Sequence, residues 1–96
     1  MSNPTKADKL FWDRLIDEVG CIACWIEGIS NHYATIHHID GRAKPGAHRR
    51  VLPLCGPHHQ TGGEGVAIHP FKTRWEAKYG NQYDLLAQVR KLIGES

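Results

Sequence analysis

The sequence lacks an apolar run long enough to cross a bilayer. Its longest one, Cys21 to Ile26, falls far short of the roughly 20 residues that a membrane-spanning helix needs. The opening residues MSNPTKADK hold no apolar stretch before their first charges, unlike a secretory signal. We therefore expect no membrane contact and a cytoplasmic location.

Cysteine is scarce, and internal repeats and low-complexity segments are absent. The three cysteines are an odd number, which argues against a disulfide framework in a reducing compartment and favours metal ligation. With 96 residues, of which 41% are hydrophobic and 23% charged, the chain has room for a single globular domain over 1–96. The same composition excludes a disordered chain.

Acidic residues are absent between Gly41 and Gly63, although the net charge of the chain is only +2. The cations in that stretch are Arg42, Lys44, Arg49 and Arg50. A run of cations without neighbouring acids favours a role in binding phosphates. The alternative is that these side chains belong to a loop that is only solvated. All seven histidines also lie in the middle of the chain, so we expect the chemistry there and the scaffold at the two ends.

The two ends of the chain have helical patterns. Thr5 and Asp8 have the spacing of a capping box, and apolar residues follow at helical spacing, which predicts a helix over 5–19. Near the C-terminus, Asn81 can cap the last of the helices that we expect over about 71–93.

The middle of the chain is punctuated by glycine and proline. Residues 34–39 and 49–54 have strand-like composition and flank a loop that contains Lys44, which predicts a hairpin with a basic loop. Pro57 suits the first turn of a helix that glycines end after one or two turns.

Two pairs of candidate metal ligands are separated by residues 25–54. They are Cys21 with Cys24, and Cys55 with His58. Two residues between the members of a pair allow a tight turn to direct both side chains at one ion, and thiolates with a neutral imidazole suit tetrahedral zinc. Four protein ligands predict a structural ion, and the alternative is ordinary buried cysteines with an incidental histidine.

Four further histidines surround these pairs: His37, His38, His59 and His69. Imidazoles bind divalent metals, and an incomplete set of protein ligands leaves room for water and substrate. A neutral imidazole is also a natural general base near pH 7. Any one of them alone is more typical of a surface or core residue, but their clustering favours a second, open metal site.

Several strings together resemble a known superfamily. HHIDGR at 37–42 and VLPLC at 51–55, followed after two residues by HH, are similar to the HNH (ββα-metal) endonuclease signature. With VAIHPF at 66–71 and YG at 79–80, the chain resembles more narrowly the Ref-type RecA-dependent nucleases of bacteriophages. The resemblance implies an α+β fold, in which a small zinc-stapled ββα-metal core over about 20–70 is flanked by N- and C-terminal helices.

The resemblance also implies roles for individual residues. His38 would be the general base, while His37 and His59 would hold a catalytic ion, Mg²⁺ or Mn²⁺. His69 is the third ligand in this interpretation, and the two Cys-containing pairs would hold structural Zn²⁺. Apart from the resemblance, the two-residue spacing of His38 and Asp40 is that of neighbours on one strand face, where the carboxylate would orient the imidazole; the alternative is a solvated turn residue.

Two features depart from the family's pattern. Arg50 stands where HNH enzymes have their middle Asn, so another group must order the hairpin loop. Ref-type proteins carry a basic N-terminal arm, whereas few residues precede the first predicted helix here, so the resemblance alone does not imply RecA dependence. The geometry of a strand also limits how His37 and His38 can act together. Neighbouring residues on a regular strand point to opposite faces, so these two share a site only if the strand ends or bulges there.

The sequence therefore predicts a metal-dependent DNA endonuclease of phage recombination or DNA processing in a bacterial host cell, with DNA and a RecA filament as candidate partners. Two other hypotheses stand beside it. A non-catalytic zinc module that binds DNA or a recombination protein would have the same zinc site without cleavage. A zinc-stabilised protein-interaction domain would not bind DNA.

Overall fold

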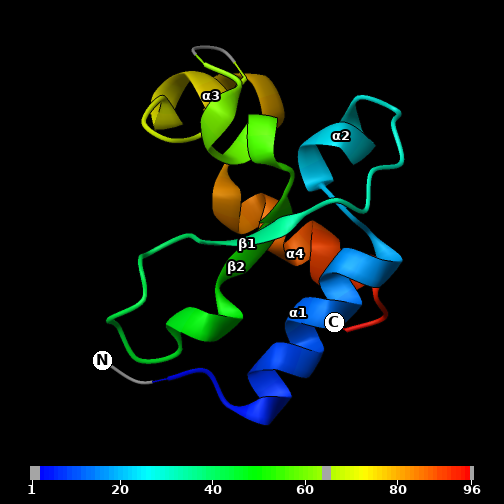
Figure 1. Cartoon of the computed structure of the whole chain (residues 1–96), viewed down its shortest axis with the longest axis vertical. Helices are drawn as coiled ribbons and strands as arrows, with labels where there is room; N and C mark the ends of the chain where they lie inside the picture. The colour runs from blue at the N-terminus through cyan, green and yellow to red at the C-terminus, as the bar shows by residue number, and fades with distance from the viewer. Residues whose placement is uncertain (1–2, 64–65, 96) are drawn as a thin grey trace.

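The computed structural model describes residues 3–63 and 66–95 (Figure 1). Within these ranges the elements are α1 (Lys6–Glu18), α2 (Ile22–Ile26), β1 (Thr35–His38), η1 (Ala47–Arg49), β2 (Val51–Leu54), η2 (Pro57–Thr61), α3 (Lys72–Tyr79) and α4 (Gln82–Leu92). The η elements are single turns of 3-10 helix and π-helix. The predicted α+β class is confirmed. No helix in the described ranges is long and apolar enough to cross a membrane.

The predicted capping box opens α1. The Thr5 hydroxyl accepts a hydrogen bond from the Asp8 backbone N–H at 3.0 Å, and the Asp8 carboxylate accepts one from the Thr5 N–H at 2.8 Å. These bonds satisfy N–H groups that the first turn of a helix leaves without partners. Beyond α1, Gly20 has φ of +77° and lies so close to the Asn31 backbone that a side chain would not fit. The chain therefore turns sharply into α2, which the sequence analysis does not predict.

β1 and β2 form the predicted antiparallel hairpin. His37 pairs with Leu52, and His38 pairs with Val51. Every residue of β2 is buried, and this strand packs against α1, α2 and α4. β1 is the neighbour of β2 in a sheet of two strands, so the outer edge of β1 has no strand partner in the described part of the chain.

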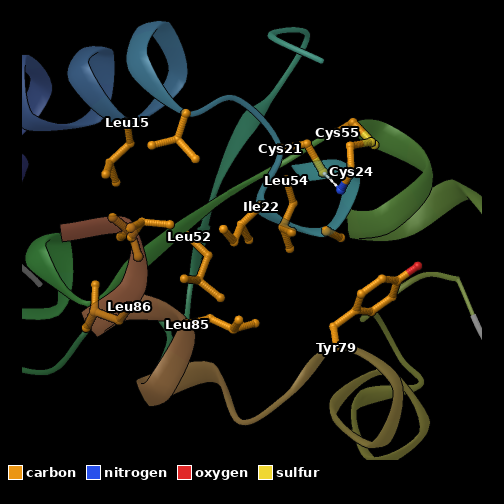
Figure 2. Packing of buried hydrophobic residues seen from close by; sticks show 14 of the residues in the cluster. Leu15, Cys21, Ile22, Cys24, Leu52, Leu54, Cys55, Tyr79, Leu85 and Leu86 are labelled. Carbon is orange, nitrogen blue, oxygen red and sulfur yellow. Dashed lines mark hydrogen bonds between the residues drawn. The ribbon is translucent and has the colours of Figure 1, made fainter. Parts of the chain in front are cut away.

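One apolar core lies around β2. Figure 2 shows Leu52 and Leu54 of this strand among Leu15, Ile22 and Leu85, with the three cysteines at one side of the same cluster. Figure 1 shows α2 and α3 at one end of the molecule and the N-terminal half of α1 at the other. Only Cys55 and Gly56 separate β2 from η2, so the core positions the end of the hairpin where the cysteines and several histidines gather.

Candidate functional site

The first cluster consists of the four ligands predicted for zinc. Cys21, Cys24, Cys55 and His58 are all buried, and each offers one ligand atom within 4.8 Å of the others. The Sγ atoms of Cys24 and Cys55 are 3.8 Å apart, and His58 Nδ1 is 3.5 Å from the Sγ atoms of both Cys21 and Cys24 and 3.0 Å from that of Cys55. Ligand atoms of tetrahedral zinc are about 3.5 to 3.8 Å apart, given Zn–S of about 2.3 Å and Zn–N of about 2.0 Å. The cluster can therefore hold a metal ion, consistent with structural zinc.

Neighbouring side chains orient the His58 ring. Its Nε2 lies 3.0 Å from the Tyr79 hydroxyl and 3.2 Å from Glu27 Oε1, and the Tyr79 hydroxyl in turn donates to Glu27 Oε2 at 3.0 Å. With Glu27 as the acceptor, the ring proton lies on Nε2 and the lone pair of Nδ1 faces the three sulfurs. This is the outer hydrogen bond that metal-bound histidines normally make.

Burial also determines how the cysteines behave without a metal. It raises the pKa of Cys21 to about 12 and raises the pKa of Cys24, since a thiolate is poorly solvated in the core. Zinc bound to these sulfurs would replace the thiol protons, so its affinity would increase with pH.

The second cluster consists of His37, His59 and His69, whose ligand atoms also lie within 4.8 Å of one another. His37 comes from β1 and His59 from η2. His69 is brought beside them by two backbone hydrogen bonds, from the Ile68 N–H to the His58 carbonyl at 2.9 Å and from the His69 N–H to the His59 carbonyl at 3.0 Å. Consecutive residues on a helical turn point in different directions, so His58 faces the sulfurs while His59 faces this cluster.

His37 and His59 each make a hydrogen bond on the ring edge that faces away from the cluster, and these bonds determine which ring nitrogen keeps its lone pair. The amide oxygen of Gln82 lies 2.7 Å from His37 Nε2, and His37 Nδ1 is 3.2 Å from His69 Nε2. The Thr35 hydroxyl donates to the Leu54 carbonyl at 3.2 Å, so at 3.1 Å it accepts from His59 Nδ1. His37 Nδ1 and His59 Nε2 are thereby left as acceptors, which is the state that a metal requires.

The structure does not bring His38 into the three-histidine cluster. β1 is regular through its last residue, so His38 points to the face opposite His37. There its Nε2 lies 3.0 Å from Nδ1 of the buried His48, and both rings contact Trp12 edge-on. Burial, together with the nearby Arg42 and His48, lowers the pKa of His38 to about 4.

Asp40 has partners other than His38. Its carboxylate accepts from the Tyr83 hydroxyl and from Arg50 Nε, the latter at 2.8 Å, and both interactions lower its pKa. Arg50 also donates to the Pro45 carbonyl at 3.1 Å. Arg50 therefore ties both ends of the hairpin loop together, which is the ordering role that the missing Asn leaves open.

Two of the four predicted phosphate-binding cations are engaged within the fold. Arg49 pairs with Asp8 at 2.7 Å and its guanidinium lies over the Phe11 ring, while Arg50 pairs with Asp40. Arg42 and Lys44 are exposed in the loop.

Several residues that complete these sites have no signal in the sequence. Gln82 and Tyr79 come from helices far along the chain, and His48 lies in the loop between the strands. The spacing of candidate metal ligands in the sequence identifies only residues that would bind the ion themselves. It gives no signal for residues that contact those ligands from the outside. The Asn81 cap is the nearest local signal, since it places Gln82 at the first position of α4.

The sequence also matches the model of a known protein family. The model of one family, described as recombination enhancement, RecA-dependent nuclease, matches residues 4–94. The match includes every residue of both clusters and all the described helices and strands. The narrower resemblance found in the sequence is thus confirmed, and the description supports a nuclease role linked to RecA and recombination. The chain belongs to the family of RecA-dependent nucleases that enhance recombination.

Proposed function

We propose that the protein is a metal-dependent endonuclease that hydrolyses DNA phosphodiester bonds, with β1, β2 and η2 as a ββα-metal core of HNH type. The observation that supports this most is the junction at η2, where His58 belongs to a closed Cys₃His cluster and His59 to an open three-histidine cluster. A module that only binds DNA needs the first cluster and has no use for the second.

The donor atoms of the open cluster suit a transition metal. Three neutral imidazoles suit first-row transition metals such as Fe²⁺, Ni²⁺ and Zn²⁺, a series to which Mn²⁺ belongs as its weakest-binding member, whereas Mg²⁺ prefers oxygen ligands. Of the two ions that the sequence suggests, Mn²⁺ therefore fits His37, His59 and His69 better. The chemistry that a bound ion supplies is stabilisation of the negative charge on the phosphoryl and leaving oxygens.

His38 is our candidate for the general base. Its pKa of about 4 leaves the imidazole neutral at pH 7, with a lone pair that can accept a proton from water, and makes it a weaker base than an imidazole that titrates near pH 7. A phosphate at the outer edge of β1, which has no strand partner among the described residues, would lie between the two faces of the strand. From there it would reach the three-histidine cluster on one side and His38, backed by His48, on the other.

The substrate is held by the exposed cations of the hairpin loop in this proposal. Arg42 and Lys44 contact phosphates and do not read bases, so weak sequence preference is expected. A RecA filament is the proposed protein partner, as the family description suggests, and recombination in a phage-infected or lysogenic bacterium is the proposed setting.

Cleavage assays test the proposal directly. Single- and double-stranded DNA are incubated with protein in Mn²⁺ and in Mg²⁺, with and without a RecA filament. We expect cleavage that is stronger in Mn²⁺ and is lost in His59→Ala and His38→Ala. His32→Ala changes a histidine that belongs to neither cluster and should cleave normally.

Two outcomes of these assays would contradict the proposal. If the folded, zinc-loaded protein binds DNA but does not cleave it under any of these conditions, a non-catalytic zinc module is the better account. If His59→Ala still cleaves while His38→Ala does not, the three-histidine cluster is not the catalytic metal site.

A further inference from the structure

Gln82 is a buried polar side chain that belongs to neither ligand set. It is 2% exposed, and its partner His37 is 3% exposed. The 2.7 Å contact between Gln82 Oε1 and His37 Nε2 joins the first residue of α4 to β1. A buried polar side chain needs a partner, and this contact places the amide of Gln82 on the outer side of the three-histidine cluster.

We infer that Gln82 is a positioning residue for this cluster, which holds His37 as the Nε2–H tautomer so that Nδ1 is free to bind the metal. The inference rests on the proposed metal site. An amide oxygen can only accept, so the proton of the neutral His37 ring lies on Nε2. The lone pair of Nδ1 then points to His69, whose Nε2 is 3.2 Å away.

Loss of the amide oxygen would reverse this arrangement. A buried Nε2–H without an acceptor is unfavourable, whereas a proton on Nδ1 can be donated to His69 Nε2. The His37 proton would therefore move to Nδ1, where it occupies the ligand position. Metal binding would then require this proton to be displaced.

The position of Gln82 is itself fixed. Its backbone N–H donates to Glu76 Oε2 at 3.1 Å, and Asn81 caps the same helix by accepting from the Tyr83 N–H at 2.9 Å. Thr35 makes the corresponding contact to His59. Two of the three rings are thus oriented by neighbours that come from different elements.

The test compares Gln82→Met, which removes the acceptor at similar size, with Gln82→Glu, which keeps an acceptor. Gln88→Met makes the same chemical change elsewhere on α4 and is the matched control. The affinity of the three-histidine cluster for Mn²⁺ is measured by calorimetry on protein already loaded with zinc. Zinc content and thermal unfolding show that each variant is folded.

Outer hydrogen bonds to metal-bound histidines typically account for about 10- to 100-fold in metal affinity. We expect a loss of this size in Gln82→Met, and affinities near that of the unmodified protein in Gln82→Glu and Gln88→Met. An unchanged affinity in folded Gln82→Met would overturn the inference.

A second readout needs neither metal nor DNA. The ¹⁵N chemical shifts of the His37 ring report its tautomer, and we expect Nε2–H in the unmodified protein and Nδ1–H in Gln82→Met. The same tautomer in both would also overturn the inference. Because this measurement is independent of cleavage, it separates a failure of the Gln82 inference from a failure of the proposed nuclease function.

Discussion

His37 is an imidazole with hydrogen-bond partners on both ring nitrogens and almost no contact with solvent. Burial lowers its pKa from 6.5 to about 4, and the neighbouring His69 and His59 contribute in the same direction, against the effect of Gln82. A charged ring is therefore poorly accommodated in the fold. The same property keeps His37 available as a neutral ligand at neutral pH.

This pKa predicts how stability changes with pH. The unfolded chain takes up a proton at His37 below pH 6.5, whereas the folded protein resists it until about pH 4. The contribution is fully present above pH 6.5 and is lost as the pH falls from 6.5 to 4. The expected loss from this residue is on the order of 3 kcal/mol.

Urea unfolding at several pH values, on protein that holds one equivalent of zinc and no other metal, measures this dependence. His37→Gln cannot take up the proton, so its stability should fall less steeply between pH 6.5 and 4. His32→Gln changes an exposed histidine and should keep the slope of the unmodified protein. Equal slopes in all three proteins would contradict the assignment.

At the scale of elements, the segment between β1 and β2 carries two kinds of cation: those in ion pairs within the fold and those exposed to solvent. Arg49 and Arg50 bind Asp8 and Asp40, whereas Arg42 and Lys44 are exposed. Removing one phosphate-binding cation reduces the slope of log affinity against log salt by about 1. We expect Arg42→Ala to reduce that slope by about this amount with little effect on the melting temperature.

Arg49→Ala should behave in the opposite way. It removes the ion pair with Asp8 and the packing on Phe11, so the melting temperature falls while the salt slope for DNA binding stays the same. DNA binding by fluorescence anisotropy at several salt concentrations, with melting curves, checks both variants. A reduced salt slope in Arg49→Ala would return this residue to the DNA-binding set.

The elements that the sequence predicts well are those with local signals. The Thr5 capping box, Pro57 and the Asn81 cap act within a few residues, and the structure has helical turns at all three. α2 is missed because its five residues are too few for a periodic pattern. Spacing also predicts the Cys₃His cluster, since each pair of ligands lies in one turn.

The partners of the ligands could not be predicted in this way. Gln82 meets His37 because α4 packs against the hairpin at β2, and Tyr79 of α3 meets His58 of η2. The same holds for Arg50, whose pairing with Asp40 depends on how the loop closes. These interactions are properties of tertiary packing, and no pattern in a single sequence encodes them locally.

At the scale of the whole molecule, the Cys₃His cluster joins segments that are otherwise held by a small core. α2 supplies Cys24, Cys55 is the residue after β2, and His58 lies in η2. A domain of this size has a total stability of roughly 5 to 15 kcal/mol. The apparent binding energy of structural zinc is of similar size, on the order of 10 kcal/mol.

We therefore expect removal of zinc to unfold the whole domain, including α1 and α4, which supply none of the four ligands. Without the ion, only weak sulfur hydrogen bonds among the three thiols and His58 would join α2 to η2, and this junction would open. Circular dichroism during titration with a strong chelator should show loss of helix in one cooperative step. Cys24→Ala should give the same spectrum as the chelated protein.

His59→Ala provides the contrast, because it alters the three-histidine cluster and leaves all four zinc ligands in place. It should keep native helix content and its zinc, and lose only the second metal. A chelated protein that retains its native spectrum and melting temperature would contradict this view, since the apolar core around β2 would then be sufficient alone. The two clusters would in that case differ in ligand chemistry but not in their importance for folding.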